Sequence, residues 1–186
     1  MRYIVQCVEE RMEWVKEMQE QIPHLEICTD TTRNKYSAYA TFLRCLEMGG
    51  NEPVVHLEDD AILCENFIEK IEAAIAQHPL NVIQFFSMRK DDLTIGSRWQ
   101  AGAKYMMNQC FYSPKNFDAL LLEYGKSWSR LEQHPNGTDE MMADFLKERK
   151  ARYWNHVPNL VDHRVAKSMI DPRRSSKRQS KTFDQA

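Results

Sequence analysis

Three consecutive acidic residues, Glu58-Asp59-Asp60, directly follow an apolar stretch that reads VVHL. Burying a carboxylate without a partner is strongly unfavourable, so these side chains need either solvent or a cation. Successive side chains of a strand point to opposite sides, so Glu58 and Asp60 are expected on one side and Asp59 on the other. Mg²⁺ and Mn²⁺ bind carboxylate oxygens and keep positions open for phosphate oxygens. The pattern predicts a divalent-metal site that also grips a diphosphate; the structural alternative is an acidic turn in which Asp60 caps a helix.

Short β-rich stretches alternate with longer amphipathic stretches around this trio. The predicted strands are 3–8, 25–28, 53–57 and 81–86, and the predicted helices between them are 9–22, 34–48 and 66–78. This order predicts a single α/β domain with a mostly parallel central sheet and helices on both faces. Ligands of such sheets bind at the carboxyl ends of the strands. Asp30 and the trio should therefore meet at one edge of the sheet.

The second half of the chain is less regular. Residues 87–105 show neither the helical nor the strand periodicity of apolar residues, which predicts a long loop or lid. Trp99 in this segment is a candidate to cover a sugar or a base. Beyond it, the predicted elements are a strand at 106–113, a helix from Pro114, a helix at 139–150 and a short strand at 153–157.

The acidic trio and its surroundings resemble the metal-binding strand of GT-A glycosyltransferases, closest to the lipopolysaccharide-type family. The shared pattern is an apolar strand, Glu-Asp-Asp, further apolar residues, and Asn66-Phe67 opening a helix. The resemblance covers about residues 1–170 and implies a GT-A-like (Rossmann-like) glycosyltransferase domain there, followed by a basic tail at 171–186. It implies that Glu58 and Asp60 are the two acids of the DxD motif, with Glu58 beside the ribose and Asp60 as the main metal ligand.

Two further segments match the family pattern on the donor and acceptor sides. Asp30 falls where the family often binds the base or ribose of the nucleotide. Asp59 is counted with the donor-binding residues and is expected to turn toward the protein or the acceptor edge. Residues 108–113 resemble the segment that shapes the acceptor side.

Two later segments resemble the catalytic part of the family. Asp139 and Glu140 are similar to the acidic pair that supplies the catalytic base in inverting members, and a plain helix cap is the structural alternative for Asp139. Residues 158–163 resemble the late strand whose histidine, here His163, completes the metal site. The structural alternative for His163 is a histidine that only packs at a strand end.

Charge is unevenly distributed along the chain. Acidic residues are in excess up to His163, whereas Lys and Arg are in excess from Arg164 onward, which indicates an anionic partner. A sugar leaving a diphosphate leaves negative charge behind, and cations stabilise it. Arg164, Lys167 or the basic tail is expected to cover the diphosphate.

Together these features predict a metal-dependent, hexosyltransferase-like glycosyltransferase that uses Mn²⁺ or Mg²⁺ and a UDP- or GDP-linked sugar. The expected acceptor is a hydroxyl group, either of a hydroxymethylated pyrimidine in phage DNA or of a saccharide, and the basic tail suits contacts with DNA phosphates. Two other functions stay open. One is a non-catalytic nucleic-acid-binding protein with purely structural acids, and the other is a metal-dependent nucleotidyltransferase.

Features of the whole chain indicate a soluble protein. No apolar run approaches the roughly 20 residues needed to cross a bilayer, and the N-terminal stretch does not resemble a secretory signal. The five cysteines are scattered and form no C-x-x-C pair. These observations predict a cytoplasmic protein, in the host cytoplasm if the chain is phage-encoded.

Overall fold

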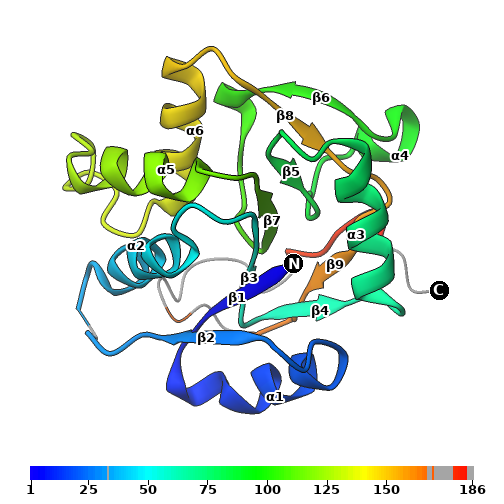
Figure 1. The fold of residues 1–186 in the computed structure, drawn as a ribbon, viewed down its shortest axis with the longest axis horizontal. Helices are drawn as coiled ribbons and strands as arrows, with labels where there is room; N and C mark the ends of the chain where they lie inside the picture. The colour runs from blue at the N-terminus through cyan, green and yellow to red at the C-terminus, as the bar shows by residue number, and fades with distance from the viewer. Residues whose placement is uncertain (33, 167–168, 170–177, 184–186) are drawn as a thin grey trace.

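The chain folds around a twisted central sheet whose strands alternate with helices along the first half of the sequence (Figure 1). The computed structural model describes residues 1–32, 34–166, 169 and 178–183. The strands are β1 (Arg2–Cys7), β2 (Glu26–Thr29), β3 (Val54–Glu58), β4 (Ala61–Leu63), β5 (Ile83–Gln84), β6 (Arg98–Ala101), β7 (Cys110–Ser113), β8 (Arg152–Asn155) and β9 (Val161–His163). The α-helices are α1 (Met12–Gln21), α2 (Ser37–Gly49), α3 (Phe67–Gln77), α4 (Asp92–Ile95), α5 (Phe117–Lys126) and α6 (Thr138–Glu148), and a 3₁₀ turn (Glu9–Arg11) precedes α1.

Within the described residues the central sheet holds seven strands in the order β2-β1-β3-β7-β5-β8-β6. β1 is parallel to β2 and to β3, and β5 is parallel to β8, whereas β7 and β6 run antiparallel to their neighbours. The mostly parallel sheet predicted from the sequence is confirmed, with β7 and β6 reversed. The register pairs Cys7 with Thr29 and Gln6 with Glu58, so the carboxyl ends of β1, β2 and β3 lie side by side.

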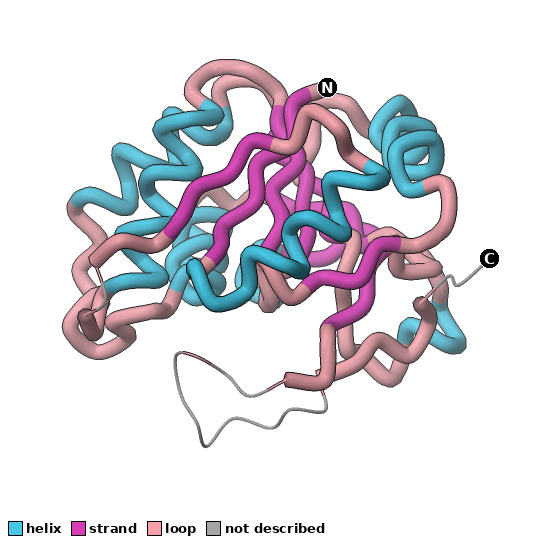
Figure 2. The backbone as a smooth tube through the Cα atoms, turned by 90° about the horizontal axis from the view of Figure 1, so that it is seen from below, coloured by secondary structure: helices cyan, strands magenta, loops and turns pink. Residues whose placement is uncertain are grey.

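Neighbouring residues of one strand pack on opposite faces of the sheet. In β1, Tyr3 and Val5 belong to a hydrophobic cluster with α1 and α3, whereas Ile4 packs with Cys45 of α2. In β7, Phe111 belongs to a cluster formed with α2, α5 and α6. Figure 2 shows the strands between helices that lie on either side. Helices therefore cover both faces of the sheet, as the sequence predicts.

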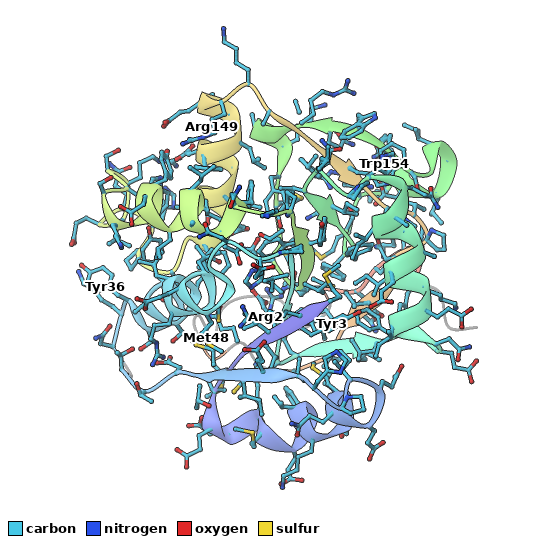
Figure 3. The ribbon with its side chains drawn as sticks, viewed as in Figure 1. Arg2, Tyr3, Tyr36, Met48, Arg149 and Trp154 are labelled. Atoms are coloured by element: carbon cyan, nitrogen blue, oxygen red, sulfur yellow. The ribbon has the colours of Figure 1, made fainter. Side chains whose placement is uncertain are left out.

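Arg2 ties the start of β1 to its neighbours, and it lies next to Met48 in Figure 3. Its guanidinium donates to the two carboxylate oxygens of Glu26 in β2 at 2.8 and 2.7 Å. It also donates to the carbonyl oxygen of Met48 in α2 at 2.8 Å. A two-pronged Arg–carboxylate contact constrains geometry as well as distance. It holds β1, β2 and α2 together at the end of the sheet opposite the acidic trio.

The acidic trio forms a turn rather than the continuation of a strand. Glu58 is the last residue of β3, Asp59 and Asp60 form the turn, and the chain continues into β4. The prediction that strand alternation separates Asp59 from Asp60 is therefore wrong, because alternation ends at Glu58. β4 pairs with β9 in a small antiparallel sheet, with Ala61 opposite His163. Both strands are three residues long; β9 falls within the segment 158–163 that resembles the family's late strand, whereas β4 was not predicted.

The segment 87–105 is not the loop or lid that the sequence predicts. It contains α4 and the edge strand β6, and Trp99 of β6 packs against Trp154 of β8 with ring centroids 5.3 Å apart. Helix α5 begins at Phe117 rather than at Pro114, because Asn116 adopts a left-handed conformation with φ of 66°. The predicted helix at 139–150 is confirmed as α6.

The described C-terminal segment, residues 178–183, hydrogen-bonds to the body of the protein. The backbone N–H of Ser180 donates to Asp162 Oδ1 at 2.7 Å, and Asn159 Nδ2 donates to Ser180 Oγ at 2.7 Å. Phe183 forms an isolated parallel bridge with Asn159 and packs against the main core. These contacts fix the position of the segment. In the part of the chain that the structure describes, no helix is both long enough and apolar enough to span a membrane.

Candidate functional site

A cavity of about 360 Å³ opens at the carboxyl ends of β1, β2 and β3. The sequence-predicted residues Asp30, Glu58, Asp59, Asp60 and Asp139 all line it. Its walls also contain Asn108 and Gln109, from the predicted acceptor-side segment 108–113, and Arg178 of the basic tail. Side chains that the sequence did not single out complete them, among them Arg11, Lys35 and Asn136. The expected convergence of strand-end acids at one sheet edge is therefore present in the structure.

Arg11 lies between two members of the acidic trio. Its Nη1 is 2.7 Å from Asp59 Oδ1 and 2.9 Å from Asp60 Oδ2, and all three side chains are at most 10% exposed. Asp59 Oδ2 also accepts the backbone N–H of Val8 at 2.8 Å. Burial raises the pKa of Asp59, and the charge of Arg11 offsets this only in part. Asp59 is thus turned toward the protein and held there by the segment that follows β1.

Asp60 faces His163 across the small β4–β9 sheet. His163 Nε2 lies 3.3 Å from Asp60 Oδ2, and both side chains are buried. Burial by itself would raise the pKa of Asp60, but the neighbouring His163, together with the charge of Arg11, brings it below its usual value. Within the described residues, Asp60 Oδ1 and His163 Nε2 make no hydrogen bond. This pair therefore has an oxygen and a nitrogen available for a further partner.

The tautomer of His163 follows from its other ring nitrogen. Nδ1 lies 2.6 Å from the carbonyl oxygen of Arg164, which can only accept, so Nδ1 carries the proton. In the neutral ring Nε2 then presents a lone pair toward Asp60. The Asp60 carboxylate needs positive charge on this side, supplied either by a second proton on His163, which makes the ion pair, or by a cation between the two side chains. The pair fits a divalent ion, because carboxylate oxygen and imidazole nitrogen are both common metal ligands.

Glu58 is the most perturbed acid of the site. Its Oε2 accepts a hydrogen bond from Gln109 Nε2 at 2.9 Å, and its backbone N–H donates to Gln109 O at 3.0 Å. Burial raises its pKa to about 8, and the charges of Asp60, Asp59 and Asp139 add to the effect. Glu58 must therefore lose a proton before it can bind a cation. Among the described residues, no group of three His, Cys, Asp or Glu side chains is arranged to hold a metal ion.

Asp139 and Asp30 line different parts of the cavity wall. Asp139 lies in the first turn of α6, and its Oδ2 accepts the backbone N–H of Met107 at 3.4 Å. Glu140 does not line the cavity, and its Oε1 lies 3.9 Å from His134 Nδ1. Asp30 follows β2, and its Oδ1 accepts the N–H of Thr32 at 2.9 Å. Of the predicted acidic pair, the structure brings only Asp139 to the cavity.

The predicted cations are distributed differently from the expectation. Arg164 pairs with Glu17 and stacks 5.3 Å from the Trp14 ring, so it does not line the cavity. Lys167 lies outside the described residues. Arg178 of the basic tail does line the cavity, and its charge acts to lower the pKa of both Glu58 and Asp60, opposite to the effect of their burial.

No protein-family model and no curated protein sequence matches the chain. Solved structures match its fold. The crystal structure of A197 from STIV has a TM-score of 0.50 at 15% identity, over 99% of this chain and 96% of that one. S. aureus TarS in complex with UDP-GlcNAc has a TM-score of 0.51 at 9% identity, over 87% and 57% of the two chains. The fold is GT-A-like.

A third match broadens the comparison within this fold. A putative glucose-1-phosphate thymidylyltransferase from Bacillus anthracis, in complex with sucrose, has a TM-score of 0.50 at 11% identity. It covers 86% of this chain and 69% of that one. At such identities the likeness shows the fold alone. Membership of the lipopolysaccharide-type family stays a prediction.

Proposed function

We propose that this chain is a metal-dependent glycosyltransferase that takes a sugar from a nucleoside-diphosphate donor and transfers it to a hydroxyl group. One observation carries the proposal. The Asp60–His163 pair, Glu58, Asp30 and Asp139 come from separate elements and gather at the carboxyl edge of a GT-A-like sheet, all but His163 lining one cavity. In open α/β sheets this edge is where ligands bind.

We assign the divalent cation, Mn²⁺ or Mg²⁺, to Asp60 Oδ1 and His163 Nε2. When bound, it would neutralise the charge that develops on the diphosphate as the sugar leaves. Once its proton is lost, Glu58 would be a further ligand of this ion or would contact the ribose. Phosphate oxygens and solvent would fill the remaining positions, because Mg²⁺ and Mn²⁺ sites commonly use few protein carboxylates.

The remaining cavity residues divide between donor and acceptor. We assign Asp30 to the ribose or base, since it lies at the end of β2 beside the end of β1. We assign Arg178, in place of Arg164, to the diphosphate, because it faces the carboxylates from the C-terminal segment. Asp139, in the first turn of α6, is placed to take the proton of the acceptor hydroxyl.

Isothermal titration with UDP and with GDP, each with and without Mn²⁺, tests the proposal. We expect one nucleotide to bind in a Mn²⁺-dependent manner, and we expect Asp60→Asn and His163→Gln each to remove the Mn²⁺ dependence. His24→Ala is the matched histidine control, because His24 is exposed and lies outside the cavity. Wild-type protein that binds neither nucleotide in the presence of Mn²⁺ would overturn the proposal.

Nucleotidyl transfer is the second candidate, since two carboxylates and a cation serve that chemistry too and a thymidylyltransferase shares the fold. The released product distinguishes the two reactions. A screen of nucleotide sugars that releases UDP or GDP supports sugar transfer. Pyrophosphate released from a nucleoside triphosphate and a sugar phosphate supports nucleotidyl transfer instead.

The acceptor we propose to test first is hydroxymethylated pyrimidine in DNA, with a saccharide as the alternative. The basic tail is the feature that favours DNA, because phosphate contacts through Lys and Arg give salt-dependent affinity. Replacing Arg173, Arg174 and Lys177 with serine leaves Arg178 in the cavity. Unchanged DNA affinity in this variant would remove DNA as the acceptor.

A further inference from the structure

Two neighbouring polar side chains in the cavity wall have unused hydrogen-bonding groups. Asn108 is 4% exposed, and neither its Nδ2 nor its Oδ1 has a hydrogen-bond partner among the described residues. Gln109 is 2% exposed, and its Oε1 likewise has none in the described part of the chain. Buried polar groups are nearly always paired in native proteins, so each exception needs an explanation. Both residues line the cavity, which indicates a ligand as the missing partner.

The backbone before Asn108 is held in an unusual conformation. Met107 has φ of 72°, in the left-handed region that non-glycine residues rarely adopt. Contacts from elsewhere in the chain hold it there. Gln84 Nε2 donates to the carbonyl oxygens of Met106 and Met107, and the N–H of Met107 donates to Asp139 Oδ2 at 3.4 Å. Strained backbone that the surroundings enforce is concentrated at functional sites.

The sequence neighbours of Asn108 contact one acid each, and this position indicates which part of a substrate Asn108 would contact. Gln109, on one side, hydrogen-bonds through Nε2 to Glu58 Oε2 at 2.9 Å. Met107, on the other side, is hydrogen-bonded to Asp139. In the proposed reaction Glu58 belongs to the donor side and Asp139 to the acceptor side. The transferred sugar must lie between these two acids.

We propose that Asn108, supported by Gln109, recognises hydroxyl groups of the transferred sugar and so helps to select the donor. A primary amide offers a donor and an acceptor in one plane, and a sugar hydroxyl both accepts and donates. Sugar hydroxyls can therefore satisfy Asn108 Nδ2 and Oδ1, and Gln109 Oε1 can accept from a further hydroxyl. A nucleoside diphosphate without its sugar lacks these groups. This inference rests on the proposed function and adds the part of the substrate that Asn108 recognises.

The test compares a nucleotide sugar with its bare nucleotide in the same variant. The probes are UDP-glucose and UDP, or GDP-mannose and GDP, according to which base the wild-type protein binds in the presence of Mn²⁺. In Asn108→Ala and Asn108→Leu we expect affinity for the nucleotide sugar to fall by about tenfold or more, because the sugar hydroxyls lose the amide to which they hydrogen-bond. Affinity for the bare nucleotide should change by less than about twofold.

Thermal unfolding gives a second measurement. If Asn108 only stabilised the fold, its replacement would lower Tm. Replacing an unpaired buried amide with an apolar side chain of similar size removes a desolvation cost, so Asn108→Leu should not lower Tm. Asn155→Ala is the matched control. Asn155 is also buried with an unpartnered Oδ1 among the described residues, but it donates to Asp92 in the structure and does not line the cavity. The Asn155→Ala variant should have a lower Tm and keep the wild-type ratio of the affinities for nucleotide sugar and bare nucleotide.

The outcomes separate this inference from the proposed function. Wild-type protein that binds no nucleotide overturns the proposed function before Asn108 is tested. Wild-type protein that binds the nucleotide, together with Asn108 variants whose affinity ratio stays within about twofold of wild type, overturns the role of Asn108 alone. A lower Tm in Asn108→Leu with an unchanged ratio would make the residue structural.

Discussion

Arg11 Nη1 lies 2.9 Å from Asp60 Oδ2, in the place where a cation would be expected beside this carboxylate. The same nitrogen is 2.7 Å from Asp59 Oδ1. The structure thus neutralises its buried acids with an internal cation, while Asp60 Oδ1 stays without a hydrogen bond in the described part of the chain. A divalent ion on Asp60 would share that carboxylate with Arg11.

Arg11→Met should therefore destabilise the protein and increase the effect of metal. Removing one partner of a buried ion pair costs about 3–5 kcal/mol, because the other charge is left unpaired. A bound Mn²⁺ would replace the lost charge. Urea unfolding with and without Mn²⁺ should show a larger Mn²⁺ stabilisation in Arg11→Met than in wild type.

The control for this variant is Lys16→Met in α1. Lys16 pairs with Glu13, but the two side chains are 62% and 80% exposed. Exposed pairs contribute about 0–1 kcal/mol, so this variant should keep wild-type stability and metal response. Equal Mn²⁺ stabilisation in Arg11→Met and wild type would contradict the idea that Arg11 and the metal share Asp60.

The sequence was sufficient to predict the strand-end acids, because both parts of that signal are local. An apolar run followed by polar residues marks the end of a buried strand, and the alternation of strands with helices places Asp30 and Glu58 at one edge. Arg11 could not be predicted in this way. Its partner Asp59 is 48 positions away, and nothing local distinguishes Arg11 from other cations near a helix start.

Contacts between segments far apart in the sequence set the geometry of the rest of the site, which local patterns do not show. The approach of His163 to Asp60 was expected only from the family resemblance, because the pairing of β4 with β9 joins residues about a hundred positions apart. The conformation of Met107, which presents Asn108, depends on contacts from Gln84 and Asp139. The basic tail was visible as composition, but only its anchoring by Asn159 and Asp162 shows that Arg178 reaches the cavity.

Because the pKa of Glu58 is raised in the folded protein, we expect its contribution to the free energy of unfolding to fall as the pH rises. Its pKa is about 8 in the folded protein and 4.5 in its ordinary state, so the folded state binds more protons between these values. Its contribution is fully present below about pH 4.5 and is lost as the pH rises through about 8, at up to about 1.4 kcal/mol per pH unit.

Glu58→Gln isolates this contribution, because glutamine keeps the shape of the neutral acid without a titrating proton. Urea unfolding between about pH 5 and pH 8 should show Glu58→Gln gaining stability relative to wild type as the pH rises. Glu69→Gln on the exposed face of α3 should follow wild type at every pH. Parallel pH profiles for wild type and Glu58→Gln would exclude a raised pKa for Glu58 in the folded protein.

We expect Arg178 to strengthen binding of the nucleoside diphosphate but not of the nucleoside. Hydrogen bonds to charged groups contribute about 1.5–3 kcal/mol each, so Arg178→Ala should weaken UDP or GDP binding by about tenfold or more. Binding of the corresponding nucleoside should not change, and Arg178→Lys should recover part of the loss. Lys181→Ala is the control, because Lys181 is exposed in the same segment and does not line the cavity. Equal losses for nucleoside and diphosphate would point to a collapsed cavity instead.

Asp139 and Glu140 are adjacent in sequence, yet only Asp139 lines the cavity. If Asp139 is the general base, Asp139→Asn should lower turnover by about 10²–10⁴-fold and leave donor affinity near wild type. The asparagine Oδ1 can still accept the N–H of Met107, so the wall that carries Asn108 should keep its place. Glu140→Gln should retain most activity. Donor hydrolysis, in which water replaces the acceptor, measures both variants, and equal activities for the two would remove Asp139 from the catalytic step.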